Sequence, residues 1–409
     1  MAFGKRFTPD RIWILPVVAL SVALGVCLYK YYSVVIPKPE EQGQDQPPLP
    51  IDDLEAGIDA DTMAAYRKRG AIYGKIKPTE DGYGHFVDAK RAEATGMPAF
   101  EFQKFPEGKL PEVGVSFGLV VFNSKLTDGG LNELGTHKNL VYLSIGMTGV
   151  TDAGLRELRN LPGLTKLSVE SCKGATGLGM KELKALTHLD ISRSGLTDAG
   201  LKELTEHKNL TYLDIAFTGV TVAGLKELRE FKNLETLVLH ATQITDVGLR
   251  DLKELKHLRR IYLAKTAVTD AGLMELKDHT NLNGLILSYT SVTDVGLEIL
   301  KNFKHLTVLD LGTTKVTDAG LQGIKAYNKL TELDLSATNV TDVILKELKE
   351  LKNLTTLSLA ATKVTDAGLK DLTGLKNLTT LNLYKTETTY QGIAELQLAL
   401  PKCRIYSFR

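Results

Sequence analysis

From about residue 114 onward, the hydrophobic positions follow one pattern that returns roughly every 24 residues. The stretch LTYLDI, residues 210–215, alternates apolar and polar side chains, which predicts a strand with one buried face. The stretch TDAGLKEL, residues 197–204, places Leu201 and Leu204 on one face of a short helix, with Thr197 or Asp198 as its N-cap. One strand and one helix per period predict a stacked, parallel architecture.

The threonine that opens the helical stretch shows how regular the array is. It recurs every 24 residues from Thr197 to Thr389, and the earlier intervals are 24, 25 and 21 residues. The short interval predicts an irregular outer loop near residues 172–188. Residues 62–113 are predicted to cap one end of the array, and a last strand in ALPKCRIYSF is predicted to close the other.

The repeated phrase resembles the leucine-rich repeat, whose strand carries the pattern LxxLxL. Its TDxGL ending is similar to the cysteine-containing subclass of that family, known from F-box-type adaptors and bacterial surface proteins. The resemblance covers residues 114–409 and implies an α/β fold, a leucine-rich-repeat solenoid with a curved parallel sheet inside and short helices outside. Where the family has Asn or Cys after the strand, this chain has mostly Thr, whose hydroxyl can bond the adjacent backbone in a similar way. Cys172 falls in that column, so we predict a structural role for it.

The N-terminal region, residues 1–36, is predicted to be a signal-anchor. Its segment Ile12–Tyr29 has no charge, and its 18 residues would make a helix of roughly 27 Å, close to a bilayer core of about 30 Å. Three basic residues precede the segment and two follow it, which favours a cytoplasmic N-terminus and extracytoplasmic repeats. A cleaved signal and a secreted protein are the alternative. Residues 37–61 form a Pro-rich linker.

Composition and motifs argue against several functions. The formal net charge is +1, which gives no attraction toward nucleic acid. The three cysteines have neither a disulfide framework nor zinc spacing. We find no nucleophile elbow, phosphate-binding loop or zinc-protease motif. We therefore predict no enzymatic activity, no cofactor and no metal. The histidines near the helix ends are predicted to be partly solvated outer residues: His137, His207 and His279 in one repeat phase, and His257 and His305 in another.

The outward-facing strand positions contain one less polar zone. Aromatic and apolar side chains with Arg at the edge have the composition of a binding hot spot for a protein partner. The alternative is that β propensity alone places Tyr, Val and Ile on strands. We call this predicted set the inner patch; its members are Tyr212, Phe217, Val238, His240, Arg260, Tyr262, Ile286 and Tyr289.

Two pairs of acidic residues fall on neighbouring predicted strands, Asp190 with Asp214 and Asp310 with Asp334. Their backbones are predicted to lie roughly 5 Å apart. We expect exposed carboxylates screened by water, with a site for Ca²⁺ or a cationic partner as the alternative.

Together these features predict a non-enzymatic scaffold, tethered to a membrane through residues 12–29, that binds a protein partner through the concave sheet face. The alternative is a structural envelope protein that packs by repeat stacking or on wall polymer.

Overall fold

The computed structural model describes residues 57–79, 82–89 and 95–407. The chain divides into two compact units, Met1–Ile51 and Asp52–Arg409, and every described residue belongs to the second. The predicted membrane segment, residues 12–29, and most of the predicted linker lie outside the described residues. Within those ranges, no helix is long and apolar enough to cross a membrane.

The described residues form a single sheet of sixteen strands. Strand β1 pairs in antiparallel fashion with β2 and β3, and from β3 to β16 each strand pairs in parallel with the next along the chain. The strands are β1 Ala71–Lys77, β2 His85–Asp88, β3 Met97–Phe102, β4 Phe117–Val121, β5 Leu140–Ser144, β6 Lys166–Ser168, β7 His188–Asp190, β8 Tyr212–Asp214, β9 Thr236–Val238, β10 Arg260–Tyr262, β11 Gly284–Ile286, β12 Val308–Asp310, β13 Glu332–Asp334, β14 Thr356–Ser358, β15 Thr380–Asn382 and β16 Arg404–Tyr406.

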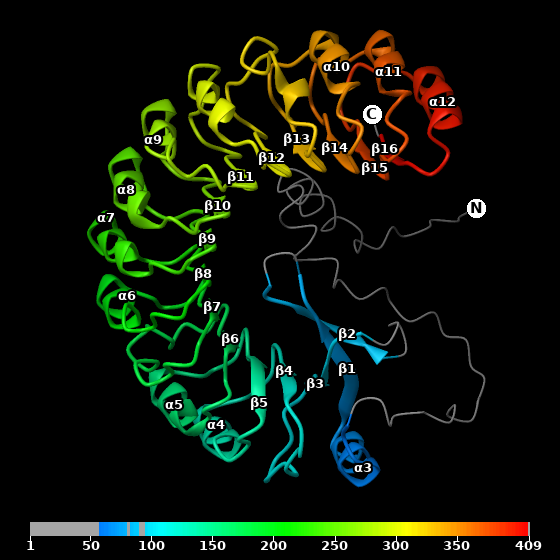
Figure 1. The fold of residues 1–409 in the computed structure, drawn as a ribbon. Helices are drawn as coiled ribbons and strands as arrows, with labels where there is room; N and C mark the ends of the chain where they lie inside the picture. The colour runs from blue at the N-terminus through cyan, green and yellow to red at the C-terminus, as the bar shows by residue number, and fades with distance from the viewer. Residues whose placement is uncertain (1–56, 80–81, 90–94, 408–409) are drawn as a thin grey trace, which may run out of the picture. The chain divides into compact units, whose positions relative to one another are not determined.

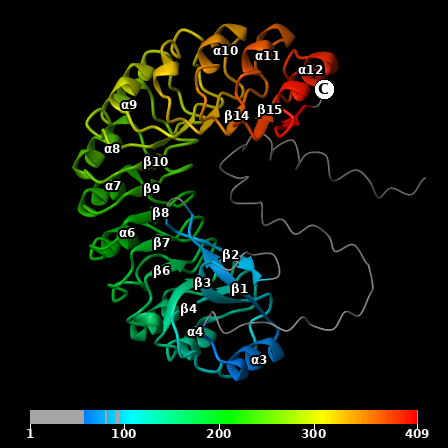
Figure 2. The same ribbon diagram turned by 45° about the vertical axis from the view of Figure 1, so that its right-hand side comes forward.

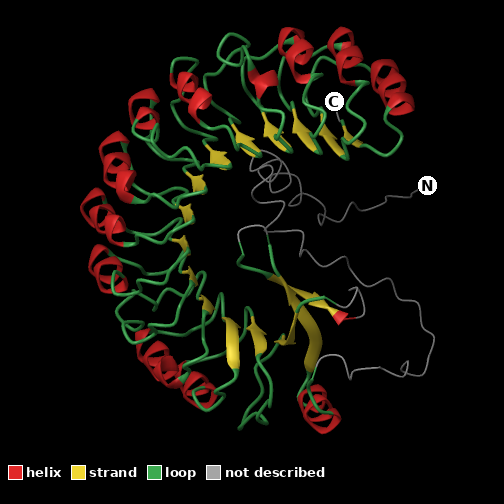
Figure 3. Cartoon of the chain, in the orientation of Figure 1, coloured by secondary structure: helices red, strands yellow, loops and turns green. Residues whose placement is uncertain are grey.

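In Asp52–Arg409 the repeats form a curved array (Figures 1, 2 and 3). The parallel sheet lines the inner, concave side of this array, and the short helices of the repeats lie on its outer side. This arrangement confirms the predicted parallel inner sheet with outer helices. The α-helices are α3 Ala60–Lys68, α4 Asp128–Leu134, α5 Asp152–Glu157, α6 Asp198–Leu204, α7 Val222–Leu225, α8 Asp246–Arg250, α9 Asp270–Met274, α10 Asp342–Leu348, α11 Asp366–Leu372 and α12 Tyr390–Ala399. Short 3₁₀ helices are η3 Leu158–Asn160, η4 Lys226–Glu230, η5 Asp251–Glu254, η6 Gly296–Asn302 and η7 Ile324–Ala326.

The connection between β6 and β7 contains turns and no helix. It coincides with the 21-residue interval, which is too short for the helix and return that the neighbouring repeats contain. The predicted irregular outer loop near residues 172–188 is therefore present.

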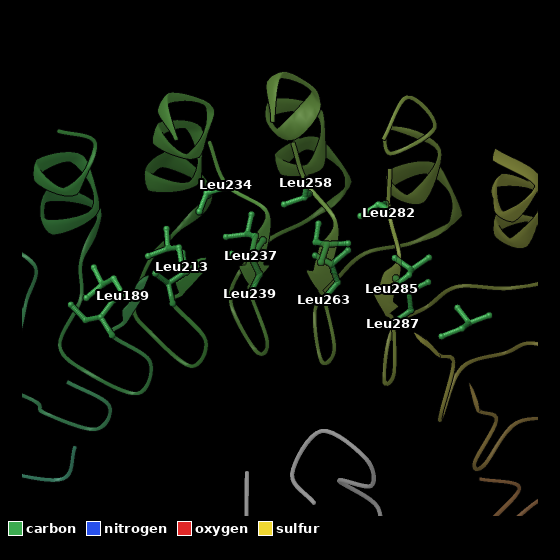
Figure 4. Packing of buried hydrophobic residues seen from close by; sticks show 14 of the residues in the cluster. Leu189, Leu213, Leu234, Leu237, Leu239, Leu258, Leu263, Leu282, Leu285 and Leu287 are labelled. Atoms are coloured by element: carbon green, nitrogen blue, oxygen red, sulfur yellow. The ribbon is translucent and has the colours of Figure 1, made fainter. Parts of the chain in front are cut away.

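Leucines from successive repeats stack between the sheet and the helices (Figure 4). Leu237 lies on β9 directly beside Leu213 on β8 and Ile261 on β10, and all three are fully buried. Each such burial contributes on the order of 1.5–3 kcal/mol. Because every repeat contributes the same positions, one continuous core runs along the array.

The threonine column after the strands bonds the backbone, as predicted. Thr242 Oγ1 donates to the Leu239 carbonyl at 2.8 Å, and Thr266 Oγ1 donates to the Leu263 carbonyl at 2.6 Å. Cys172 is fully buried in the same column, and its Sγ donates to the Ile145 carbonyl at 3.2 Å. Its surroundings support the structural role predicted for it.

The aspartate of each TD pair binds the threonine of the following repeat. Asp246 Oδ1 accepts a hydrogen bond from the Thr269 backbone N–H at 2.8 Å, and its Oδ2 accepts one from Thr269 Oγ1 at 2.7 Å. We call this two-bond contact the Asp–Thr clamp. It joins Asp128 to Thr151, Asp152 to Thr176, Asp198 to Thr221, Asp246 to Thr269, Asp270 to Thr293, Asp294 to Thr317, Asp318 to Thr341, Asp342 to Thr365 and Asp366 to Thr389.

The threonine is the N-cap of its own helix, as predicted, and the clamp gives it a second role that the sequence did not predict. Thr269 does act as that N-cap, since its Oγ1 accepts from the Ala271 N–H at 3.3 Å. The same hydroxyl also donates to Asp246 of the preceding repeat. Hydrogen bonds to an ionised carboxylate are about twice as strong as neutral ones, so each clamp fixes the spacing of two neighbouring repeats.

The glycine of TDxGL leaves room for the clamp. A Cβ at Gly272 would lie 2.8 Å from the Asp246 Cα atom and closer still to its carboxylate. At Gly248, which follows the repeat that has Val222 in place of Asp, the nearest atom to such a Cβ is Ile244 Cγ1, at 2.9 Å. Asp and Gly of the motif therefore act together across the boundary between repeats.

Two joints within the described array have no Asp–Thr clamp. One lies between β8 and β9, because Val222 stands where Asp is needed, and Thr245 at the start of α8 makes no side-chain cap hydrogen bond. The other lies between β6 and β7, inside the short repeat, where Gly177 precedes the Thr197 repeat. These joints rely on the sheet, the core and inner-face contacts.

The prediction that the outer histidines are partly solvated holds for the exposed His257 and His305 and is wrong for the three histidines of the other phase. His137, His207 and His279 are 3%, 0% and 4% exposed. The Nε2 of His207 bonds the Met180 carbonyl at 3.0 Å, and that of His279 bonds the Leu252 carbonyl at 3.0 Å. These two rings thus bridge to the preceding repeat, and the His137 Nε2 bonds the Pro111 carbonyl of the N-terminal cap at 3.2 Å.

We expect Gly272→Ala to lower the free energy of unfolding by about 1–2 kcal/mol more than Gly248→Ala, because only Gly272 receives an aspartate from the repeat before it. Both glycines are the third residue of a five-residue helix, so helix propensity changes equally. Urea unfolding of the two variants measures the difference. Equal losses would contradict this role for the glycine.

We expect Val222→Asp to raise the free energy of unfolding by about 1–2 kcal/mol, because the new carboxylate can accept from Thr245 beside Gly248, which has no side chain to exclude it. Ala223→Asp is the control, since it adds an acid to the same first helical turn without reaching the next repeat. A thermal melt in which the two variants gain equally would show a helix-dipole effect and no clamp.

Candidate inner-face site

Sheet register arranges the inner face in two rows of side chains. The first row runs Tyr142, Lys166, His188, Tyr212, Thr236, Arg260 from β5 to β10. The second row runs Ser168, Asp190, Asp214, Val238, Tyr262, Ile286, Asp310, Asp334 from β6 to β13. In the second row, an apolar triple lies between two acid pairs, and strand spacing of about 4.8 Å sets the distances along it.

The structure gathers the inner patch on β8–β11 and on the turns that follow these strands. Tyr212, Val238 and Ile286 are buried, at 6%, 6% and 1% exposure. The remaining five are half-buried: Phe217, His240, Arg260, Tyr262 and Tyr289. Only five of the eight predicted residues therefore contribute substantially to the accessible surface of the patch.

Ring contacts organise the accessible part of the patch. The His240 and Tyr262 rings meet edge to face, with centroids 5.4 Å apart. The Arg193 guanidinium lies 4.0 Å from the centre of the Phe217 ring, and Lys265 Nζ lies 5.3 Å from that of Tyr289. Cation–π contacts of this kind contribute about 0.5–1 kcal/mol at exposed sites, so they orient the rings as well as cover them.

Phe217 and Tyr289 occupy a left-handed backbone position, with φ of 55° and 57°. Such a conformation in a bulky residue often indicates local strain at a functional site. Here the corresponding non-glycine residue has positive φ in every repeat from Asn123 to Lys385. The Phe217 N–H donates to the His240 carbonyl at 2.8 Å, so pairing with the next repeat holds the turn. The conformation belongs to the repeat and does not single out a site.

A segment far away in sequence covers the first part of the inner face. Tyr83, in the connection between β1 and β2, packs its ring against Tyr142, His188 and Tyr212, with centroid distances of 5.8, 6.4 and 5.1 Å. It also packs against the buried cluster of Tyr212, Ala216 and Val238. Sequence reasoning missed this contact, because nothing in residues 82–85 repeats or shows a motif.

Both acid pairs are buried, so the prediction of exposed, water-screened carboxylates is wrong. Asp190 and Asp214 are 3% and 4% exposed, and Asp310 and Asp334 are 7% and 6% exposed. Hydrogen bonds satisfy much of their acceptor capacity: Asp310 accepts from Ser288 Oγ at 2.7 Å and from the Gly312 N–H at 2.9 Å. Curvature toward the inner side and neighbouring side chains remove these columns from water, which strand alternation alone does not reveal.

Burial and mutual repulsion raise the pKa of the carboxyl groups in the acid pairs. Burial, followed by the neighbouring Asp334, raises the pKa of Asp310 to about 7. Burial and then Asp190 raise the pKa of Asp214 well above its usual value. Glu170 beside the first pair has its pKa raised to about 7 by burial and Asp190, opposed by Arg193, whose Nε is 3.6 Å from its carboxylate. At neutral pH each pair is therefore stabilised when its two carboxyl groups share one proton, or when a cationic group lies beside them.

The site offers binding surfaces and no assembled reaction centre among the described residues. His240 accepts from the Ala264 N–H at 3.1 Å, and burial lowers its pKa to about 4, so it is neutral at pH 7. The part of the chain that the structure describes contains no group of three or more His, Cys, Asp or Glu side chains that could hold a metal ion.

Comparisons with known proteins agree with this architecture. A family model described as a leucine-rich repeat region matches residues 160–392. The chain is similar to the crystal structure of an internalin from Listeria monocytogenes, with 23% identity and a TM-score of 0.54 over 80% of this chain and 90% of that one. It is also similar to a leucine-rich-repeat protein of Leptospira interrogans, with 18% identity and a TM-score of 0.43 over 71% and 89% of the two chains. At these identities the likeness concerns the fold alone. No curated protein matches the sequence.

We expect the free energy of unfolding of Asp310→Asn, minus that of the parent, to rise between pH 5 and pH 8. The pKa of Asp310 is about 7 when folded and about 3.9 in an unfolded chain, so the folded protein holds a proton that the unfolded chain releases. The stability contributed by that proton is present below about pH 4 and is lost as pH rises through 7. Asparagine does not titrate and keeps an acceptor for the Gly312 N–H.

Urea unfolding at each pH measures this difference, and Asp278→Asn on the exposed outer surface is the control. A difference for Asp310→Asn that stays flat or falls with pH would contradict the proposed burial of the pair.

Proposed function

Because the chain belongs to the leucine-rich-repeat family, we propose that it is a membrane-tethered, non-enzymatic scaffold that binds a protein partner through the inner face of its sheet. Proteins of this fold commonly present a rigid curved surface to a partner. The observation that carries the proposal is the second register row, in which Val238, Tyr262 and Ile286 lie between two acid pairs.

The partner's contact segment is proposed to have an apolar centre with basic groups on either side. Half-buried Tyr262 and Tyr289 offer large, rigid contact area at low entropic cost, which is typical of residues that dominate binding energy. The buried carboxyls of Asp214 and Asp310 lie one strand beyond each end of the apolar triple. A cationic side chain placed there would favour their ionised forms.

The tether rests on the sequence of residues 12–29, which is uncharged and long enough to span a bilayer. With more basic residues before the segment than after it, the proposed topology has a cytoplasmic N-terminus and extracytoplasmic repeats. Secretion after signal cleavage is the alternative.

One observation favours the second candidate function, a structural protein that packs by repeat stacking. Val247, Val295 and Val343 are 60%, 65% and 60% exposed, and they follow the clamp aspartate of every second repeat on the outer side. Such a row of apolar side chains could contact another copy or a wall polymer. It is sparse, since single exposed apolar residues are common on soluble proteins.

We expect the combined variant Tyr262→Ser and Tyr289→Ser to lose at least ten-fold in partner capture, because truncating buried interface aromatics costs on the order of 2 kcal/mol or more. The full chain, expressed in its membrane, is crosslinked and purified, and captured proteins are quantified. Tyr390→Ser with Leu398→Ser is the matched control, because both side chains are exposed on the outer helix α12.

A single protein captured by the parent and the control, and lost by the inner variant, supports the binding scaffold. Capture of other copies of this chain alone, unchanged by the inner variant, would support the structural alternative.

A further inference from the structure

We propose that the inner face of β5–β8 is a recognition site for an aromatic side chain flanked by glycines, and that Gly82–Gly84 of the same chain is its resident ligand. We call Gly82–Gly84 the Tyr83 segment, and Tyr142, Lys166, His188 and Tyr212 the cage. The proposal concerns a different part of the face from the accessible part of the inner patch, and it does not depend on the proposed partner.

The cage is built from one register row. Tyr142 pairs with Lys166, Lys166 with His188 and His188 with Tyr212, each across one parallel strand step. Four strand positions at about 4.8 Å spacing extend over roughly 14 Å, which suits one aromatic residue with its two neighbours. The His188 and Tyr212 rings stack on each other, with centroids 5.9 Å apart and planes 14° apart, so each holds the other in place.

Ring packing recognises the Tyr83 side chain. Its ring meets Tyr142 edge to face at 5.8 Å and lies tilted 5.1 Å from Tyr212. Aromatic pairs at such distances contribute about 0.5–1.5 kcal/mol each beyond their buried area. The Tyr83 hydroxyl at the end of the ring is buried as well.

Lys166 and Tyr142 recognise the backbone of the segment. Lys166 Nζ donates to the Gly82 carbonyl and, at 3.1 Å, to the Tyr83 carbonyl. The Tyr142 hydroxyl is 3.5 Å from the Gly84 carbonyl. These contacts involve backbone carbonyls only, so a peptide of another chain with the same backbone conformation could make them too. Three carbonyls held from two neighbouring strands resemble the way in which peptide-binding grooves hold their ligands.

Close approach imposes the glycine requirement. Gly82 and Gly84 have φ of +78° and +97°, a region that L side chains rarely adopt. A Cβ at Gly82 would lie 3.0 Å from His188 Nε2, against the cage wall. A ligand with a bulky residue before the aromatic one would therefore meet both backbone strain and the histidine ring.

Attachment in the same chain explains why this site is filled. The Tyr83 segment connects β1 and β2, whose pairing with β3 continues into the parallel sheet. A ligand held this way has an effective concentration on the order of millimolar, so a free competitor of ordinary affinity is excluded. Removing the resident ring should therefore open the cage to a ligand supplied from outside.

The test uses the full chain and a synthetic peptide with the sequence Gly-Tyr-Gly-His, blocked at both ends, as the probe. We expect Tyr83→Ala to bind the peptide at least ten-fold more tightly than the parent does, as measured by saturation-transfer NMR titration. The same peptide with Ala in place of Tyr should not bind. Adding Lys166→Met to Tyr83→Ala should reduce peptide binding at least three-fold, because the backbone carbonyls lose their donor.

A second variant covers the case in which Tyr83→Ala does not fold. Gly82→Ala keeps the ring but displaces the segment from His188, and it should also gain peptide binding. Tyr390→Ala, on the outer surface, should gain none. A folded Tyr83→Ala chain that binds the peptide no more tightly than the parent does would overturn the proposal. Loss of cooperative folding in both variants would also overturn it, since the segment would then be part of the fold and no ligand.

Discussion

The Asp–Thr clamp is the interaction on which the regular array depends. One carboxylate accepts two hydrogen bonds from the next repeat, and the glycine that follows the threonine gives it space. Because the bond always joins neighbouring copies, it turns a short phrase into a fixed spacing between strands. The leucine core supplies most of the burial energy, but apolar packing alone is less directional than a two-bond contact. The clamp therefore reinforces, on the outer side, a strand register that also holds at the two joints without a clamp.

Register in turn decides what the inner face can present. Parallel pairing without slippage places Val238, Tyr262 and Ile286 side by side, and it places each acid pair on adjacent strands. A carboxyl pair in such a buried row opposes full ionisation, which the array tolerates because backbone and serine donors satisfy the oxygens. Arg193 covers the Phe217 ring and also lies 3.6 Å from the Glu170 carboxylate, whereas Lys265 covers the Tyr289 ring.

The inner contacts are concentrated where the outer clamps are missing. The Tyr83 segment touches β5, β6, β7 and β8, and so it spans the unclamped joint between β6 and β7. The buried cluster that includes Tyr212 and Val238 spans the second joint, between β8 and β9. Aromatic packing on the inner side is therefore found at the two joints where the outer Asp–Thr hydrogen bonds are absent. The half-buried residues of the patch lie mostly on β10 and on the turns after β8–β11.

The sequence by itself determined the repeat, the parallel sheet, the outer helices, the threonine column and the buried role of Cys172, because each depends on neighbours within one period. It also located the patch around Tyr262 and Tyr289. Only the tertiary structure decided that Asp246 serves Thr269, that Asp310 and His207 are buried, and that Tyr83 lies on Tyr212. The contacts of the Tyr83 segment occur once and join residues 58 and 84 positions apart, so no repeated sequence pattern predicts them. Burial of the aspartates depends on curvature and on side chains from other strands, which a single repeat does not encode.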